Sequence, residues 1–266
     1  MLGDQFHQHD DRVMAGANAS RTLNGSLNGL PMQTTFGAQT RYDAIDPAPS
    51  DTFQRSFLSN VRSDKVGEGS VGVYAQNTMK WTDWLKTTIG WRGDYYQARV
   101  NSIFDANNSG AVSASIGSPK FTAVIGPFNK TEFFVRAGYG MYSNDGRGAT
   151  ITEDPTDPTI KLTALPLLVR TKGAEAGVPT KIIPGLDSSL SVFMLDQDSE
   201  IVFQGDTGDT SASRASRRYG AEWTNRYRPV SWFDIDADLA YSRARFSAST
   251  ANRRRCLNRS PASRRR

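Results

Sequence analysis

Residues 233–242 alternate apolar and polar side chains over their whole length. Side chains of a β-strand point to opposite faces in turn, so this segment predicts a strand with one apolar and one strongly polar face. The polar face carries three aspartates, and the apolar face carries Phe233, Ile235, Ala237, Leu239 and Tyr241. Comparable alternation recurs along the chain, with aromatic residues at the turns. This repetition favours a barrel wall with lipid outside and water inside.

The overall composition does not contradict a barrel wall. The 266 residues are 38% hydrophobic and have a mean hydropathy of −0.51, which is typical of a polar soluble protein. No run of about 18 apolar residues occurs, which excludes a membrane-spanning helix. A β-barrel strand needs only every second residue to be apolar, so a transmembrane barrel stays compatible with this composition.

Positive charge is concentrated at the end of the chain, where no acid follows Asp238. Removing seven arginines would change the formal net charge from +5 to −2; they are Arg253, Arg254, Arg255, Arg259, Arg264, Arg265 and Arg266. The basic character belongs to this segment, which lacks interleaved aromatics for base stacking, so we expect no nucleic-acid partner. The single cysteine, Cys256, excludes an intrachain disulfide, and residues 1–5 lack the basic start and apolar core of a secretory signal.

Short turns and long loops alternate along the chain. The expected strands are 5–19, 34–45, 55–64, 70–81, 87–96, 121–125, 133–141, 167–178, 186–203, 218–227 and the strand from 233. The long loops are 105–115, 143–163 and 205–215, and aromatic residues gather at the short turns, namely Trp81, Trp84, Phe128, Tyr227, Trp232 and Phe233. Strands joined in this way run up and down, with the aromatic girdle at the periplasmic headgroups. We therefore predict an all-β fold, an antiparallel up-and-down transmembrane β-barrel segment of about eleven strands, partial or open.

Several motifs resemble the barrel of TonB-dependent outer-membrane receptors. They are SVGVYAQ (70–76), GWRGDYY (90–96), SPKF (118–121) with GPF (126–128), GYGMYSNDGRG (138–148), LDQDSEIVF (195–203) and SRRYGAE (216–222). The resemblance covers roughly residues 4–246, in matching order and spacing. It implies a transport or receptor function. No nucleophile elbow, phosphate loop or zinc spacing occurs in the sequence, so we expect no enzymatic activity.

The chain also departs from this family pattern. Family members have about 22 strands around a plug domain, preceded by a TonB-contacting box, and end in an aromatic residue. Nothing here resembles a plug or a box, Tyr142 replaces a family-typical histidine, and the chain ends in three arginines. We expect residues 1–246 to be a receptor barrel fragment and 247–266 an irregular Arg-rich tail. A frameshift just after Phe246 would explain the tail, and a genuine basic tail is the alternative.

The resemblance implies active uptake of a scarce nutrient across a Gram-negative outer membrane, with TonB as the energy-coupling partner in the intact family and membrane lipid around the barrel. The nutrient would be an iron–siderophore complex, a cobalamin or a carbohydrate, and no cofactor is implied. Ligand contacts would come from the lumen and from the loops 143–163 and 205–215. The candidate contact residues in these loops are Asn144, Asp145, Arg147 and Asp206.

Four polar clusters have plainer interpretations. His7, His9 and Asp11 share a strand face and could bind a metal, but a wet barrel wall also places polar residues there, so we predict no metal site. The tripeptide 92–94 reads Arg-Gly-Asp, and in a strand its two charged side chains would pair on the lumen face. Glu153, Asp154, Asp157 and Lys161 are expected to be solvated in their loop. The row Asp196, Asp198 and Glu200 is expected to face the lumen and to pair with Arg217 or Arg218.

Two other functional interpretations remain open from the sequence. The chain could be a soluble all-β module that binds a ligand with its long loops, or a non-functional fragment of a disrupted receptor gene with two unpaired edges. A soluble sandwich would bury its apolar faces against each other. A barrel wall would instead expose Ile89, Trp91, Phe133, Val135, Trp223 and Ile235 to lipid.

Overall fold

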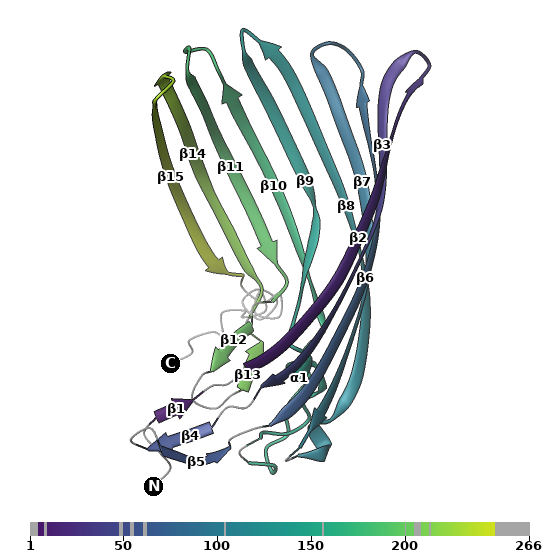
Figure 1. Cartoon of the computed structure of the whole chain (residues 1–266), viewed down its shortest axis with the longest axis vertical. Coiled ribbons are helices and arrows are strands. Elements are labelled where there is room, and N and C mark those ends of the chain that lie inside the picture. Colours follow the sequence, from purple (N-terminus) through teal and green to yellow (C-terminus); the bar gives the residue numbers. More distant parts are fainter. Residues whose placement is uncertain are drawn as a thin grey trace, which may run out of the picture.

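In a computed structural model, the chain forms one large, curved, open β-sheet with small elements at one end (Figure 1). The structure describes residues 5–7, 10–47, 50–53, 56–60, 63–103, 105–155, 157–199, 201–204, 209–212 and 214–247. None of the helices in these ranges is long and apolar enough to span a membrane.

The large sheet contains ten antiparallel strands in the order β15-β14-β11-β10-β9-β8-β7-β6-β3-β2. These are β2 (Asp10–Leu27), β3 (Leu30–Pro47), β6 (Asp64–Lys80), β7 (Leu85–Ser102), β8 (Gly110–Phe128), β9 (Thr131–Ser143), β10 (Leu168–Thr180), β11 (Leu186–Gln197), β14 (Ser216–Val230) and β15 (Phe233–Phe246). Each strand pairs with its neighbours in this order, and no described pairing joins β2 to β15. The sheet is therefore an up-and-down wall with two open edges.

The remaining elements lie at the long-loop end of the wall (Figure 1). A three-stranded sheet is formed by β1 (Gln5–His7), β4 (Ser50–Phe53) and β5 (Ser56–Asn60), and a hairpin is formed by β12 (Ile201–Gln204) and β13 (Asp209–Ala212). The 3₁₀-helix η1 (Ala106–Asn108) and the short helix α1 (Gly146–Thr150) lie in the loops that follow β7 and β9.

Tight turns close the opposite end of the wall. The β2–β3 turn is Asn28-Gly29, with positive φ angles of 52° and 79°. Two successive residues with positive φ are what a type I′ hairpin requires, and Asn-Gly is its preferred sequence. The Trp81–Trp84 turn is held by a hydrogen bond of 3.0 Å from the Trp81 N–H to the Leu85 carbonyl. The turns thus fix the register of long hairpins.

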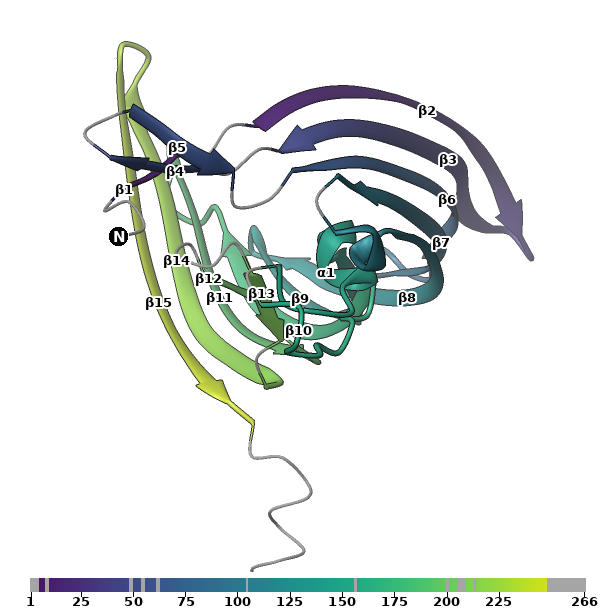
Figure 2. The same ribbon diagram turned by 90° about the horizontal axis from the view of Figure 1, so that it is seen from below.

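The two faces of the wall differ in chemistry. Figure 2 shows α1 inside the curve, where Ala149 packs against Ala98 of β7 and Leu167. Even-numbered residues of β7 therefore face the concave side. Its odd-numbered residues face the convex side, where Ile89 and Trp91 are 64% and 53% exposed. No second sheet covers this apolar face in the described part of the chain, as a soluble sandwich would require.

The apolar convex face is close in height to the outward-facing apolar band of a transmembrane β-barrel, which is about 25 Å tall. On β11 it extends from Leu186 to Met194, which is about 27 Å along the strand and roughly 20 Å across a membrane at a 40° tilt. At the short-turn end it is bordered by exposed aromatic residues, including Trp81, Trp84, Phe128, Trp232 and Phe233. This border is the aromatic girdle that the sequence predicts.

The antiparallel up-and-down fold and its openness are confirmed, whereas two of the expected wall strands are wrong. Residues 55–64 do not cross the wall, because β3 pairs directly with β6 and the five-residue β5 joins the small sheet. A tilted crossing needs about 9–11 residues, which β5 does not supply. The strand expected at 186–203 ends at Gln197, and β12 pairs with β13 instead. Strand β15 ends at Phe246, and the expected irregular structure after residue 248 lies outside the described residues.

Candidate functional site

The loop after β9 folds back into the mouth of the curved wall (Figure 2). Its anchor is Asn108, which is 1% exposed. The Asn108 amide donates hydrogen bonds to the Asp105 carboxylate (2.7 Å) and to the Glu153 carbonyl (3.0 Å). Its Oδ1 accepts from the backbone N–H groups of Thr152 (2.8 Å) and Glu153 (3.1 Å). One buried amide therefore joins the loop after β7 to the loop after β9.

Three of the four predicted ligand residues lie together at the start of this loop. Asn144 is buried, and its amide donates to the Pro166 carbonyl at 2.6 Å. Asp145 caps α1 by accepting a hydrogen bond of 2.8 Å from the Arg147 N–H. Its carboxylate also pairs with the Arg147 guanidinium at 2.5 Å. The short helix is positioned on the wall by Glu68 of β6, which accepts a hydrogen bond of 2.9 Å from the Gly146 N–H.

These residues border a polar pocket of about 220 Å³. It is lined by Asp10, Arg12, Ile45, Pro47, Val66, Glu68, Ser143, Asn144, Asp145 and Arg147. Burial opposes the charge of Arg147, but the hydrogen bonds and attraction of Asp145 outweigh this effect and raise the pKa of Arg147. The pocket therefore combines a fixed guanidinium with several carboxylates, which suits a small ligand that carries both donors and acceptors.

Farther along the loop, Asp157 and Lys161 are exposed as expected, whereas Glu153 is buried, contrary to expectation. Glu153 is 3% exposed and pairs with Lys161 across an isolated antiparallel bridge. Hydrogen bonds from Lys161 and from the Asn107 amide hold the pKa of Glu153 below its ordinary value. The expectation for Glu153 was wrong because this loop folds into the barrel mouth, where the Glu153 carboxylate becomes buried.

Other predicted positions cannot be placed with these residues. Asp206, the fourth predicted ligand residue, lies outside the described residues, as does His9. The described part of the chain contains no group of three or more histidine, cysteine, aspartate or glutamate side chains arranged for a metal ion.

The concave wall below the mouth carries ion pairs along its strands. Arg92 pairs with Asp94 at 2.7 Å and also donates to the Gln39 side chain at 2.7 Å, as expected for a strand tripeptide on the lumen face. Gly72 leaves the space for this arrangement, because a Cβ there would lie 2.2 Å from the Arg92 guanidinium. Arg41 and Asp43 form an equivalent pair at 2.7 Å on β3. The lumen face is thus polar and internally neutralised.

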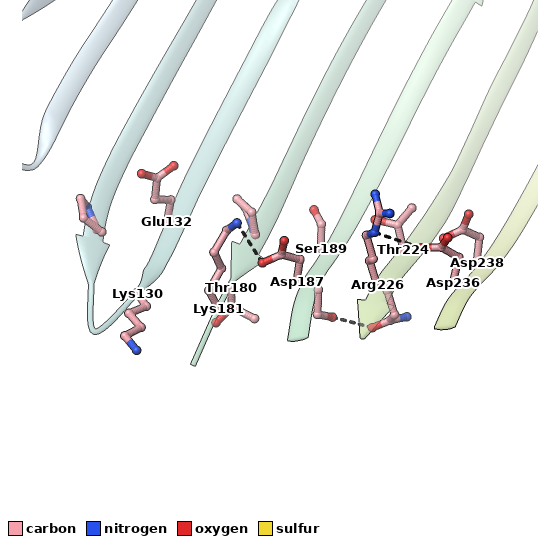
Figure 3. Close-up of a pocket in the computed structure, with 14 residues that line it drawn as sticks. Lys130, Glu132, Thr180, Lys181, Asp187, Ser189, Thr224, Arg226, Asp236 and Asp238 are labelled. Atoms are coloured by element: carbon pink, nitrogen blue, oxygen red, sulfur yellow. Dashed lines mark hydrogen bonds and ion pairs between the residues drawn. The ribbon is translucent and has the colours of Figure 1, made fainter. Parts of the chain in front are cut away.

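A larger hollow of about 580 Å³ lies at the short-turn end of the wall. Figure 3 shows that its labelled side chains come from neighbouring strands, with Asp236 and Asp238 beside Arg226 and with Lys181 paired to Asp187 at 2.8 Å. Arg226 and Asp236 approach to 3.7 Å, and Asp234 pairs with Arg226 at 3.2 Å. The lining holds four acids and three bases, so the hollow carries a small excess of negative charge.

Asp196 pairs with Arg217 as expected, with two hydrogen bonds of 2.6 and 2.9 Å, but not on the lumen face. Its strand register aligns it with Lys172 and Arg217. The same face carries Leu190, Val192 and Trp223, so Asp196 is on the convex side. The assignment of Asp196 to the lumen face was wrong because water reaches both faces of a strand beyond the apolar band. A charged residue there can lie on either face.

A curved antiparallel sheet with an apolar convex face, an aromatic border and a polar concave face is the wall of a transmembrane β-barrel. The sequence matches the family described as TonB dependent receptor-like, beta-barrel, over residues 3–264. The chain belongs to this family.

Solved structures of similar fold include three receptors or transporters. The alcaligin outer membrane receptor FauA from Bordetella pertussis is 12% identical with a TM-score of 0.66, and the match covers 91% of this chain and 40% of that chain. The ferric citrate transporter FecA has 12% identity, a TM-score of 0.68, and coverages of 91% and 37%. BauA, the ferric preacinetobactin receptor from Acinetobacter baumannii, has 15% identity, a TM-score of 0.66, and coverages of 93% and 38%.

The chain therefore spans about 40% of the length of such a receptor, and at these identities the likeness establishes the fold. Comparison with curated proteins gives no match. The family and these structural neighbours are receptors and transporters rather than enzymes.

Proposed function

We propose that this chain forms part of the barrel of an outer-membrane receptor that takes up a scarce nutrient with energy supplied through TonB. The nutrient would be an iron–siderophore complex, a cobalamin or a carbohydrate. In this proposal the convex face contacts outer-membrane lipid, and the concave face surrounds the transport path. The hollow at the short-turn end would face the plug domain of an intact receptor.

The observation that carries the proposal is the fold of the loop after β9. This loop is tied into the barrel mouth by Asn108 and Glu68, and it holds Asp145 and Arg147 at the edge of a polar pocket. A ligand arriving from the long-loop side would meet these two side chains before it reached the lumen. We therefore assign Asn144, Asp145 and Arg147 to the outer ligand contact, with Asp206 as a further contact from the loop 205–215.

Binding of known probes to the full chain, refolded into lipid vesicles, tests this proposal. The probes are ferric citrate, cyanocobalamin and maltohexaose, one for each nutrient class, and equilibrium dialysis measures their binding. We expect one probe to bind and the double variant D145N/R147Q to weaken it by about 10- to 100-fold, the range for losing charged hydrogen bonds.

The matched control is D83N, which removes another ion-paired aspartate at the opposite end of the wall. Asp83 pairs with Lys80 at 2.8 Å in the Trp81–Trp84 turn. D83N should bind the probe as the unchanged chain does. The proposal is wrong if no probe binds, or if D145N/R147Q and D83N bind with equal affinity.

A further inference from the structure

A second aromatic border marks the limit of the apolar convex face toward the long-loop end of the wall. It consists of tyrosines on five different strands, with exposures between 39% and 65%: Tyr42, Tyr95, Tyr139, Tyr219 and Tyr241. The strand pairings align Tyr139 with Lys172 and Tyr219 with Arg243. Tyrosine rings at a membrane surface lie at the level of the headgroups. Charged side chains at or just beyond these tyrosines are therefore at the height of lipid phosphates.

Basic side chains occupy this height on three strands, β10, β14 and β15, and an acid occupies it on β11 between them. The paired row Lys172, Asp196, Arg217 and Arg245 crosses β10, β11, β14 and β15 on the convex face. Arg243 lies two residues from Tyr241 on the same face of β15. Four basic side chains and one acid leave an excess of three positive charges directly above the apolar band.

This excess is not neutralised within the described part of the chain. Asp196 binds Arg217 at 2.6 Å and approaches Lys172 to 3.8 Å, so its single charge is shared between two partners. Neither Arg243 nor Arg245 forms an ion pair with any residue that the structure describes. Both side chains are exposed on the outward face of β15. The patch is therefore complementary to an anion that lies outside the barrel.

We propose that Lys172, Arg217, Arg243 and Arg245 form a binding site for the phosphate groups of anionic lipids in the surrounding leaflet. The planar guanidinium fork matches the oxygen geometry of a phosphate, and the neighbouring apolar rows accept the acyl chains of the same lipid. The site selects which lipid contacts the β10–β15 part of the wall. It is independent of nutrient binding at the mouth loop.

Fluorescence quenching by brominated lipids tests the site in vesicles that contain the inserted full chain. Trp223 lies on the same convex face, and it reports lipid contact there once the other four tryptophans are replaced with phenylalanine in all variants. The probes are brominated phosphatidic acid, brominated phosphatidylcholine and a brominated fatty acid, whose headgroups are an anionic phosphate, a zwitterion and a carboxylate. We expect preference for phosphatidic acid over phosphatidylcholine, and a roughly fivefold loss of this preference for each charge removed in R243Q/R245Q.

Two further variants test whether the lipid preference depends on these particular positions and not on the total charge or the folding of the chain. R243K/R245K keeps the charges and should retain most of the preference. K86Q/K120Q removes two basic side chains from the concave face and should leave the preference unchanged. The proposal is overturned if R243Q/R245Q keeps the full preference, if K86Q/K120Q loses as much, or if the carboxylate lipid binds as well as phosphatidic acid.

Discussion

Replacing Asn108 with alanine should release the mouth loop without unfolding the wall. The variant removes both hydrogen bonds donated by the amide and both accepted from the Thr152 and Glu153 N–H groups. Glu153 is buried with Asn108 and Asp105 is half-buried, so the three bonds to these two residues find no equivalent replacement from water, whereas the exposed Thr152 N–H can bond to water instead. At about 1 kcal/mol for each of three bonds that find no replacement, the docked loop should lose about 3 kcal/mol.

Hydrogen exchange measured on the folded chain tests this value. A loss of 3 kcal/mol should accelerate amide exchange in residues 143–167 by about 100-fold, while the paired strands β7 and β8 keep their protection. The control N107A removes one hydrogen bond of 2.7 Å to the Glu153 carboxylate and should accelerate exchange only about fivefold. Equal exchange in N108A and the unchanged chain would refute the anchoring role of Asn108, as would equal acceleration throughout the wall.

Three further perturbations test the wall and the loop. V192R places a charge on the convex face and should cost about 2–4 kcal/mol of stability in vesicles, measured by urea unfolding, whereas T224R on the concave face should cost less than about 1 kcal/mol. The lowered pKa of Glu153 means that its contribution to loop docking is present above the ordinary glutamate pKa and is lost as pH falls through the lowered value. Hydrogen exchange of residues 150–163 should therefore accelerate in acid, and E153Q should remove that dependence. G220A puts a Cβ 2.2 Å from the Tyr241 carbonyl and should destabilise the β14–β15 pairing by about 1–3 kcal/mol, whereas G25A, with nothing within 4 Å, should have little effect in the same unfolding assay.

The strand period was sufficient to predict the faces of the wall within the apolar band. Ile89 and Trp91 are outward, and Arg92 and Asp94 are inward, because the band requires one apolar face and no residue slips the register of β7. Beyond the apolar band the two-residue period no longer predicts which face a polar residue occupies, because water reaches both faces. Asp196 was assigned to the wrong face for this reason.

The sequence was less informative about the mouth. Residues 56–60 and 201–204 were expected to lie in wall strands, yet they form small sheets outside the band. Their apolar residues are adjacent in the sequence, and each segment is too short to cross the band. Asn144, Asp145 and Arg147 were predicted from family-like spacing, and they do lie together. Asn108 and Glu68 were missed because an asparagine in a polar loop and a glutamate in a strand look solvated until the partners across the mouth are known.

The central claim is that the convex face of this wall contacts lipid and the concave face contacts water. The chain has one cysteine, so a C256S background allows single spin labels at positions 88, 89, 91 and 92 of β7 in vesicle-inserted protein. Accessibility to oxygen, which concentrates in lipid, and to a water-soluble nickel complex should then be measured for each label. We predict high oxygen accessibility at 89 and 91 and high nickel accessibility at 88 and 92. Equal accessibility at all four positions, or shielding of 89 and 91 from both reagents, would contradict a lipid-facing barrel wall.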